Sequence, residues 1–207
     1  MLKRPYFIGI AGASCSGKTS VAVYLAENLT LGDAVIVGLD SYYYDLSSLP
    51  PEEIHQYNLD EPAALDEDLL FANMHALADG GIIEKPRYDH KTHSRHEKPE
   101  IIEAMDFVVI EGLFTLHWPE LRRLLHTSVF IDASDSVCLE RRTRRDRTLR
   151  GRSAEEVRER YEKMVKPMFD RWVLPTRQYA DTHINGHDPL HRSVATILQN
   201  IQKNLEQ

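Results

Sequence analysis

Short apolar runs alternate with amphipathic segments along the chain. The runs at 6–10, 34–39, 107–110 and 129–131 are rich in Val, Ile and Phe and predict four strands. The last two are apolar on both faces, which is typical of strands in a parallel sheet that helices cover on both sides. The pattern therefore predicts an α/β fold with a parallel central sheet.

Amphipathic segments at 18–28, 65–78 and 189–205 predict helices. In the second segment, apolar residues recur at helical spacing, at Leu65, Leu69, Leu70, Met74 and Leu77. The last segment suits a helix packed on the sheet as well as it suits a contact between subunits, since it carries Leu190, Val194, Ile197, Leu198 and Ile201.

The pattern changes between Gly80 and Glu103, where two isoleucine pairs bracket a polar, histidine-rich stretch. This arrangement predicts a hairpin-like excursion from the core over 80–103. No repeat, low-complexity tract or linker divides the chain. We therefore expect residues 1–207 to form a single domain.

Composition narrows the class of protein. A chain of 207 residues with 42% hydrophobic content can bury one well-packed core. Its formal net charge of -7 argues against a nucleic-acid partner. No apolar run approaches the roughly 20 residues that span a bilayer, so no membrane partner is expected. Cys15 and Cys138 form no disulfide framework, which favours a reducing, cytoplasmic location.

The stretch GASCSGKTS at 12–20 follows the first predicted strand and opens the first predicted helix. This placement is typical of a phosphate-binding loop, in which backbone N–H groups converge on phosphate oxygens. Lys18 would reach the β- and γ-phosphates, and the Thr19 hydroxyl would bind Mg²⁺. Cys15 is either a small filler or a reactive thiol. The nucleotide-binding residues are predicted as Gly12, Ala13, Ser14, Cys15, Ser16, Gly17, Lys18, Thr19 and Ser20.

A phosphate-binding loop alone does not distinguish a kinase from a GTPase switch or a mechanical ATPase. The chain has no Asn-Lys-x-Asp guanine-reading motif, which weakens the switch hypothesis. Asp40 follows the second predicted strand, at the edge of the sheet where open α/β folds bind ligands. Glu111 ends the third in the same way and is a candidate Mg²⁺ ligand. The structural alternatives are a turn residue for Asp40 and a cap for Glu111.

An arginine-rich segment over 141–153 is the candidate for a mobile lid. It carries seven arginines in the twelve positions of RRTRRDRTLRGR. Arg142 and Arg145 would share a helical face, and Gly151 permits a bend between Arg150 and Arg152. Such an array supplies bidentate donors to a transferring phosphoryl group. A solvated charged helix is the alternative interpretation.

Seven segments together resemble the uridine/cytidine kinases, which belong to the group of P-loop kinases that includes the phosphoribulokinases. They are GASCSGKTS, LDSYYYD, YNLDEPAALD, PRYDHKTHSR, VVIEGLF, RRTRRDRTLRGRS and VKPMFDRWVLPTRQYAD. The resemblance covers the chain from about 6 to about 187. It implies a three-layer P-loop fold with a substrate-binding hairpin and an arginine-rich lid. It also implies transfer of the γ-phosphoryl group of ATP, or GTP, to the 5′-hydroxyl of uridine or cytidine.

The resemblance also implies roles for single residues. Asp40 would be the general base and would neighbour Mg²⁺ together with Thr19 and Glu111. Catalysis would further involve Lys18, Arg145 and Arg150. The nucleoside would be held by Asp40, Tyr43, Asp60, Tyr88, His93, Arg142 and Arg152. Relatives are often oligomeric, so a homo-oligomer is an expectation by resemblance only.

The chain departs from the family pattern around the base pocket, at Leu59, His90 and Arg160. The acceptor therefore stays open to a different nucleoside, nicotinamide riboside or a sugar phosphate. A nucleotide-binding regulator without turnover is the alternative from another class. His90, His93 and His96 are equally spaced, but without a nearby cysteine they are better explained as substrate surface than as a zinc site.

Overall fold

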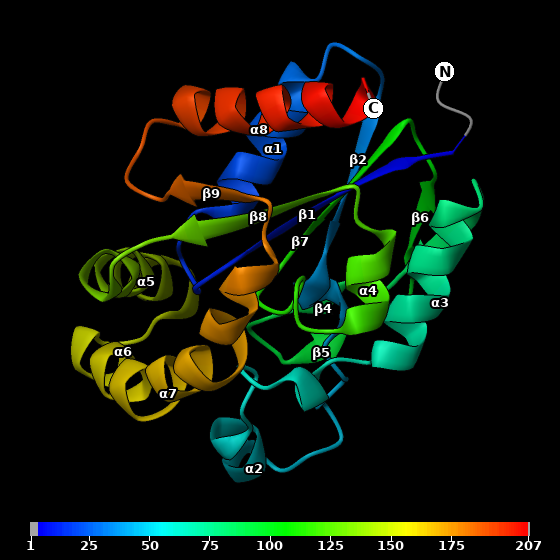
Figure 1. Ribbon diagram of the computed structural model, residues 1–207. Helices are drawn as coiled ribbons and strands as arrows, with labels where there is room; N and C mark the ends of the chain where they lie inside the picture. Colours follow the sequence, from blue (N-terminus) through cyan, green and yellow to red (C-terminus); the bar gives the residue numbers. More distant parts are fainter. Residues whose placement is uncertain (1–3, 207) are drawn as a thin grey trace.

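A five-stranded parallel sheet forms the centre of the computed structural model, which describes residues 4–206 apart from the side chain of His55 (Figure 1). The strand order is β2-β7-β1-β8-β9, and each neighbouring pair is parallel. The bounds are β1 (Tyr6–Gly12), β2 (Ala34–Gly38), β7 (Phe107–Glu111), β8 (Thr127–Asp132) and β9 (Thr182–Asn185). The sheet confirms the predicted α/β class.

Helices cover both faces of this sheet (Figure 1). On one face lie α1 (Lys18–Asn28) and α8 (Leu190–Leu205), whose buried side chains Val21 and Ile197 share a core with Ile8 of β1. On the other face lie α3 (Glu67–Ala78) and α4 (Pro119–Leu124). The alternation of side chains along β1 supplies both cores, since Phe7 and Ala11 pack on the second face.

A run of helices and helical turns connects β8 to β9. It comprises α5 (Asp135–Arg150), α6 (Ala154–Arg160), α7 (Lys166–Met168), the π-helical turns Tyr161–Val165 and Phe169–Val173, and the 3-10 helix Leu174–Tyr179. Further short elements are α2 (Pro51–Gln56) and the 3-10 turns Leu39–Tyr42 and Pro62–Ala64. Cys138 of α5 packs against Ala13 and so joins this run to the end of β1.

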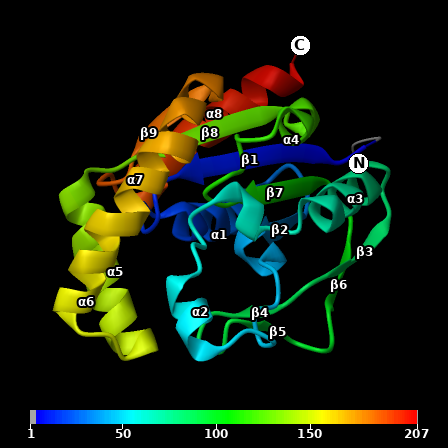
Figure 2. The same cartoon turned by 90° about the horizontal axis from the view of Figure 1, so that it is seen from below.

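The excursion over 80–103 is a two-part antiparallel hairpin, as predicted. Its base pairs β3 (Ile82–Lys85) with β6 (Glu100–Glu103), and its tip pairs β4 (Tyr88–Asp89) with β5 (Ser94–Arg95). Figure 2 shows the tip beside α2, beyond the edge of the sheet. The Arg95 guanidinium donates to the carbonyls of Tyr42 and Tyr43 at 2.9 and 2.8 Å, so it ties the tip to the segment after β2.

Several element boundaries differ from the sequence-based expectation by one or two residues, and two of these differences have a clear local cause. The second strand ends at Gly38 rather than Leu39, because the chain turns there into a 3-10 helix that carries Asp40. The helix expected from Leu65 begins at Glu67, because the Asp66 carboxylate caps it by accepting the Leu69 N–H at 3.2 Å.

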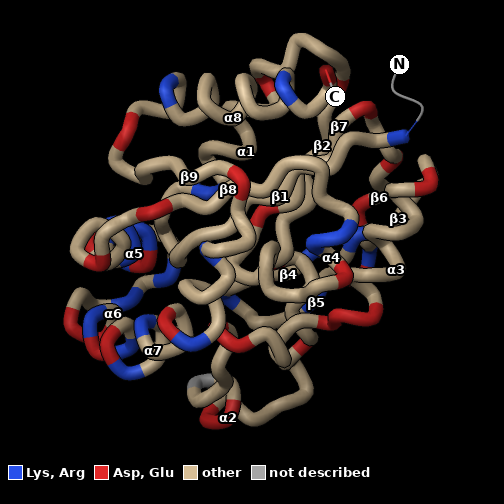
Figure 3. The backbone as a smooth tube through the Cα atoms, viewed as in Figure 1, with Lys and Arg blue, Asp and Glu red and all other residues tan. Residues whose placement is uncertain are grey.

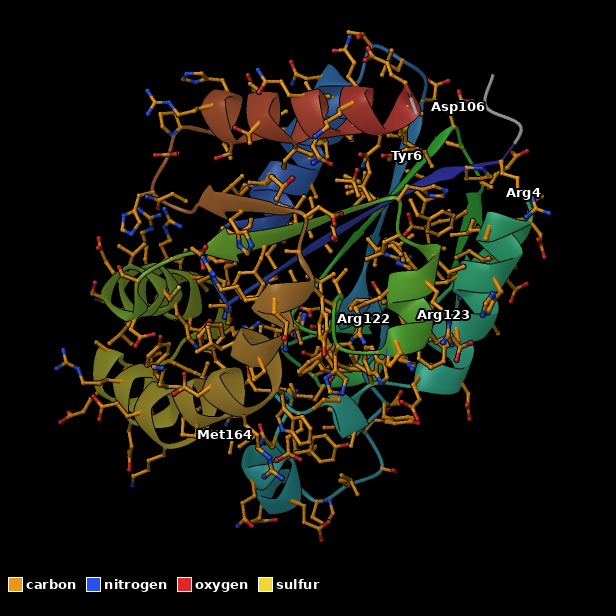
Figure 4. All side chains as sticks on the ribbon, in the orientation of Figure 1. Arg4, Tyr6, Asp106, Arg122, Arg123 and Met164 are labelled. Carbon is orange, nitrogen blue, oxygen red and sulfur yellow. The ribbon has the colours of Figure 1, made fainter. Side chains whose placement is uncertain are left out.

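Arg122, labelled in Figure 4, fixes the chain between β7 and α4. Its guanidinium donates to the carbonyls of Leu116 and His117 at 2.9 and 2.7 Å and lies 3.9 Å from the centre of the Tyr179 ring. Within residues 4–206, no helix combines the length and the apolar character needed to cross a bilayer.

Candidate active site

The loop between β1 and α1 has the backbone of a phosphate cradle. Gly17 precedes the first helical residue in a left-handed conformation with φ 110°. A Cβ atom at Gly12 would lie 2.8 Å from the Ile131 carbonyl oxygen, so only glycine fits there. Cys15 also has a positive φ, of 65°, which is unusual for a residue with a side chain. These conformations make a tight turn ahead of α1, in which the Ser16 N–H donates to the Ala13 carbonyl at 3.1 Å.

Three polar side chains of this loop are of the kinds that contact a bound anion or cation. The Lys18 ammonium is buried and donates to the Ala13 carbonyl at 2.9 Å. The Thr19 hydroxyl donates to Glu111 Oε1 at 3.0 Å. Ser16 Oγ is buried without a hydrogen-bond partner among the described residues. Such an unsatisfied polar atom suits a loop whose ligand supplies the remaining contacts.

Asp40 and Glu111 lie at the carboxyl edges of adjacent strands, because Gly38 of β2 pairs with Glu111 of β7. Burial raises the pKa of the Glu111 carboxyl, the Lys18 charge opposes this shift, and Asp40 adds to it. Two neighbouring carboxylates and the Thr19 hydroxyl form a set of hard oxygen donors. These residues fit Mg²⁺, which prefers such ligands.

A cavity of about 610 Å³ joins this edge to the loop and to α5. Most of the predicted site residues line it: Ser14, Cys15, Ser16, Gly17, Lys18, Thr19, Ser20, Asp40, Tyr43, Asp60, His93, Glu111, Arg142, Arg145, Arg150 and Arg152. Gly12, Ala13 and Tyr88 are not among the lining residues. The residues predicted for the nucleotide and those predicted for the acceptor thus line one space.

The end of the cavity that the predicted acceptor residues line is aromatic and polar. Tyr88 supports it from behind, since its ring centre lies 5.4 Å from that of Tyr43 and its hydroxyl lies 3.3 Å from His93 Nδ1. His90 Nε2 lies 3.9 Å from Asp40 Oδ2. Burial raises the pKa of the Asp60 carboxyl, while the Arg142 and Arg160 guanidinium groups oppose the shift.

The lid arginines converge on one carboxylate that the sequence analysis did not single out. Asp146 is fully buried, and four guanidinium groups lie within 4 Å of it. Their distances from the carboxylate are 3.7 Å for Arg142, 2.8 Å for Arg145, 3.7 Å for Arg150 and 3.6 Å for Arg152. Figure 3 shows the basic positions gathered on α5 and near the start of α6.

Two further contributors to the cavity were missed. Arg141 donates to the Ser16 carbonyl at 3.1 Å and to the Gly186 carbonyl at 2.9 Å, so it joins the phosphate loop to the turn after β9. That turn contributes Asn185, Gly186, Asp188, Pro189 and Leu190 to the lining. Arg141 lies inside the arginine-rich run, but the sequence does not show which member faces the loop. The turn follows a short strand with little apolar signal.

The equally spaced histidines do not gather around one point. Within the described part of the chain, no group of three or more His, Cys, Asp or Glu residues could hold a metal ion. His90 and His93 instead face the cavity from the hairpin tip.

The fold and the site define a P-loop protein of the nucleotide-dependent phosphotransferase type, because a phosphate loop, a carboxylate edge and an arginine lid face one cavity. Residues 7–188 match the model of the phosphoribulokinase/uridine kinase family. The chain belongs to this family.

Relatives support this assignment over the whole chain. It is 41% identical to a uridine kinase of Halalkalibacterium halodurans over 89% of this chain and 87% of the relative. It is 40% identical to a uridine kinase of Geobacillus sp. (strain WCH70) over 100% of this chain and 98% of the relative. A phosphoribulokinase structure from Rhodobacter spheroides shares the fold with a TM-score of 0.67 at 13% identity, covering 91% of this chain and 75% of that one.

Proposed function

We propose that this protein transfers the γ-phosphoryl group of ATP, or GTP, to the 5′-hydroxyl of uridine or cytidine, giving UMP or CMP. One observation carries the proposal: the phosphate loop, Asp40 and the acceptor residues Asp60, Tyr43 and His93 line a single cavity. Phosphoryl transfer needs donor and acceptor in one such space, because most of its catalysis is positioning and charge stabilisation. The names of the relatives supply the substrate class.

The donor nucleotide binds along the loop. Backbone N–H groups of 12–17 and the start of α1 hold its phosphates, and the Lys18 ammonium moves from the Ala13 carbonyl to the β- and γ-phosphate oxygens. Thr19, Asp40 and Glu111 would hold Mg²⁺, which would supply positive charge that neutralises the phosphates. Arg141 steadies the loop through the Ser16 carbonyl.

The acceptor binds at the other end of the cavity. Asp60 and Arg142 hold the ribose hydroxyls, since a carboxylate accepts from both members of a diol. Tyr43 covers the sugar, and His93, oriented by Tyr88, reads the edge of the pyrimidine. The acceptor hydroxyl then points to Asp40.

In the chemical step, Asp40 takes the proton of the 5′-hydroxyl. The nucleoside oxygen forms a bond to the γ-phosphorus while the bond from that phosphorus to the β–γ bridging oxygen breaks, and ADP leaves. Arg145, Arg150 and Arg152 stabilise the charge that spreads over the transferring oxygens.

The test is an Asp40→Asn substitution in an assay of ADP formation with uridine. We expect ATP affinity to stay within about threefold of wild type and kcat to fall by about 10²–10⁴-fold, because the substitution removes the general base. Ser47→Ala is the control, since Ser47 is exposed in the segment that follows the 3-10 helix of Asp40. If Asp40→Asn turns over uridine as fast as wild type, Asp40 is not the general base.

A second acceptor class has one observation in its favour. A cavity of about 600 Å³ adjoins the acceptor end, and its basic lining consists of His90, Lys91, His93, Arg150, Arg152 and Arg160. Among the described residues, no carboxylate lines it. This basic wall suits an acceptor that carries an anionic group, such as a sugar phosphate. Turnover of ribulose 5-phosphate in preference to uridine would favour that class.

A further inference from the structure

Asp146 is the only acidic residue among the buried side chains of residues 4–206. It lies in the last turns of α5 and does not line the 610 Å³ cavity. The four arginines around it do line that cavity. The carboxylate therefore stands behind the arginines, on the side away from the space where phosphates bind.

The two oxygens of Asp146 are used differently. Oδ1 accepts a hydrogen bond from Arg145 Nε at 2.8 Å and lies 3.7 Å from Arg150 Nε. Oδ2 lies 3.7 Å from Arg142 Nε and 3.6 Å from Arg152 Nη1, yet it has no hydrogen-bond partner among the described residues. A buried carboxylate oxygen without a hydrogen bond is uncommon. Here it lies between two cations from different parts of the lid.

The main chain of Asp146 adds a second link to the same turn. Its carbonyl accepts the N–H of Gly151, which ends α5 in a left-handed conformation, and the N–H of Arg152 at 3.2 Å. One residue thus fixes the turn that leads from Arg150 to Arg152 through its backbone and its side chain. The arginines before and after this turn can then face the cavity together.

The charges around Asp146 do not balance. Although burial raises the pKa of its carboxyl, the arginines outweigh burial and lower that pKa. Burial lowers the pKa of the Arg150 guanidinium, and repulsion from Arg145, Arg142 and Arg152 lowers it further. One carboxylate is surrounded by four guanidinium cations, so the cluster keeps a net positive charge. A transferring phosphoryl group supplies negative charge on the open side of the same arginines.

We propose that Asp146 is a positioning residue for phosphoryl transfer. Its buried carboxylate is shared among Arg142, Arg145, Arg150 and Arg152 and holds these four side chains in place as a preassembled wall of the cavity. This proposal rests on the proposed phosphotransferase function. Preassembled charges need no reorganisation during reaction, so they stabilise the transition state more than mobile ones do. Arg142 extends the wall to the phosphate loop, where it donates to Ser14 Oγ at 3.0 Å.

The test compares wild type, Asp146→Asn, Arg145→Gln and the double variant, all as full-length protein with Mg-ATP and uridine. We expect Asp146→Asn to lower kcat at least about tenfold, since Arg145, Arg150 and Arg152 act on the reacting phosphoryl group, and to raise the KM for uridine by a smaller factor, since only Arg142 of the four holds the ribose. Asp135→Asn is the control on the same helix, because the exposed Asp135 pairs with Lys166 at 3.6 Å.

The double variant separates positioning from folding. A residue that acts partly through Arg145 makes the two losses less than multiplicative, so we expect the double variant to keep a higher kcat than the product of the two single losses gives. Losses in kcat that multiply, or a kcat in Asp146→Asn equal to that of the control at a lower melting temperature, would overturn the proposal. If Asp146→Asn does not fold, the same cycle is run with Asp146→Glu, which keeps the charge.

The outcomes also separate this inference from the proposed function. If wild type turns over no pyrimidine nucleoside, the proposed function fails, and the cycle is run with the acceptor that is used. If wild type turns over uridine and Asp146→Asn keeps its kcat, only the role of Asp146 fails.

Discussion

At the scale of single residues, Asp60 shows a conflict between binding and stability. The fold disfavours its charged form, since burial raises the pKa of its carboxyl. The folded pKa lies above the unfolded one, so the protein gains stability as the pH falls through the folded pKa and loses it as the pH rises. Ribose binding needs the charged form, because only a carboxylate accepts hydrogen bonds from both hydroxyls.

An Asp60→Asn substitution should expose this conflict. We expect the KM for uridine to rise by about 10–100-fold, since hydrogen bonds to charged groups are strong. The melting temperature at pH 7 should stay equal to that of wild type or rise. For wild type, the KM for uridine should increase as the pH falls through the raised pKa of the Asp60 carboxyl, whereas the variant should lack this dependence. A large loss of melting temperature with an unchanged KM would show that Asp60 is structural.

Some parts of the site could be predicted from the sequence and others could not. The phosphate loop, Asp40 and Glu111 follow strands directly, and the carboxyl ends of parallel strands meet at one edge. Asp146 was not predictable as the centre of the lid. Its contact with Arg152 depends on the turn at Gly151, and although Arg142 and Arg150 stand four residues to either side of it in α5, that spacing does not show that the carboxylate is buried.

At the scale of secondary-structure elements, the turn after α5 determines how Arg152 is placed relative to the lid arginines of the helix. Gly151 has φ 67° and a Cβ atom there would meet nothing within 4 Å. A substitution to alanine would therefore act through backbone strain and not through a clash, at a cost of about 1 kcal/mol.

Gly151→Ala should lower both stability and turnover. Gly80→Ala is the matched control, because Gly80 has φ 79°, lies between α3 and the hairpin, and offers a Cβ atom the same open space, with nothing within 4 Å. We expect similar losses of unfolding free energy in chemical denaturation and a kcat at least about threefold lower in Gly151→Ala alone, since preassembled charges stabilise the transition state. Equal kcat values would show that the turn does not position the arginines.

The apolar strands and the hairpin were predictable, because burial on both faces and paired isoleucines mark them. Strand β9 has the sequence THIN and offers little apolar contrast, so its place beside β8 depends on tertiary pairing. Helix α6 begins with a capping box between Ser153 and Glu156, a local signal that was present in the sequence and was not used.

At the scale of the whole molecule, charge is distributed unevenly. The chain has a formal net charge of -7, yet eight Lys and Arg side chains line the 610 Å³ cavity against four Asp and Glu side chains. A basic cleft in an acidic protein attracts an anionic ligand over short distances, and salt screens that attraction.

We therefore expect kcat/KM for Mg-ATP to fall as ionic strength rises from about 0.02 to about 0.3 M, by about threefold or more. Arg144→Gln should weaken this dependence, because Arg144 is an exposed member of the cavity lining without an assigned role in transfer. Arg123→Gln on α4, away from the cavity, is the control. A kcat/KM for Mg-ATP that rises with ionic strength would mean that the net negative charge of the protein outweighs the positive charge of the cavity.

A single domain over 1–207, a homo-oligomer and a cytoplasmic location stay predictions from the sequence. The buried stripe of α8 against α1 accounts for Val194, Ile197 and Ile201, so the packing alternative explains that part of the helix. Leu190 and Leu205 are 37% and 39% exposed and lie at its ends.

The most direct test of pyrimidine nucleoside kinase activity is the measurement of kcat/KM for acceptor-dependent ADP formation with Mg-ATP across uridine, cytidine, purine nucleosides, nicotinamide riboside and ribulose 5-phosphate. We predict that uridine or cytidine exceeds every other acceptor by at least about tenfold, which corresponds to about 1.4 kcal/mol of transition-state discrimination. If neither pyrimidine nucleoside is turned over and another acceptor is, the result would contradict this assignment. That result would assign the cavity around Leu59, His90 and Arg160 to a different substrate.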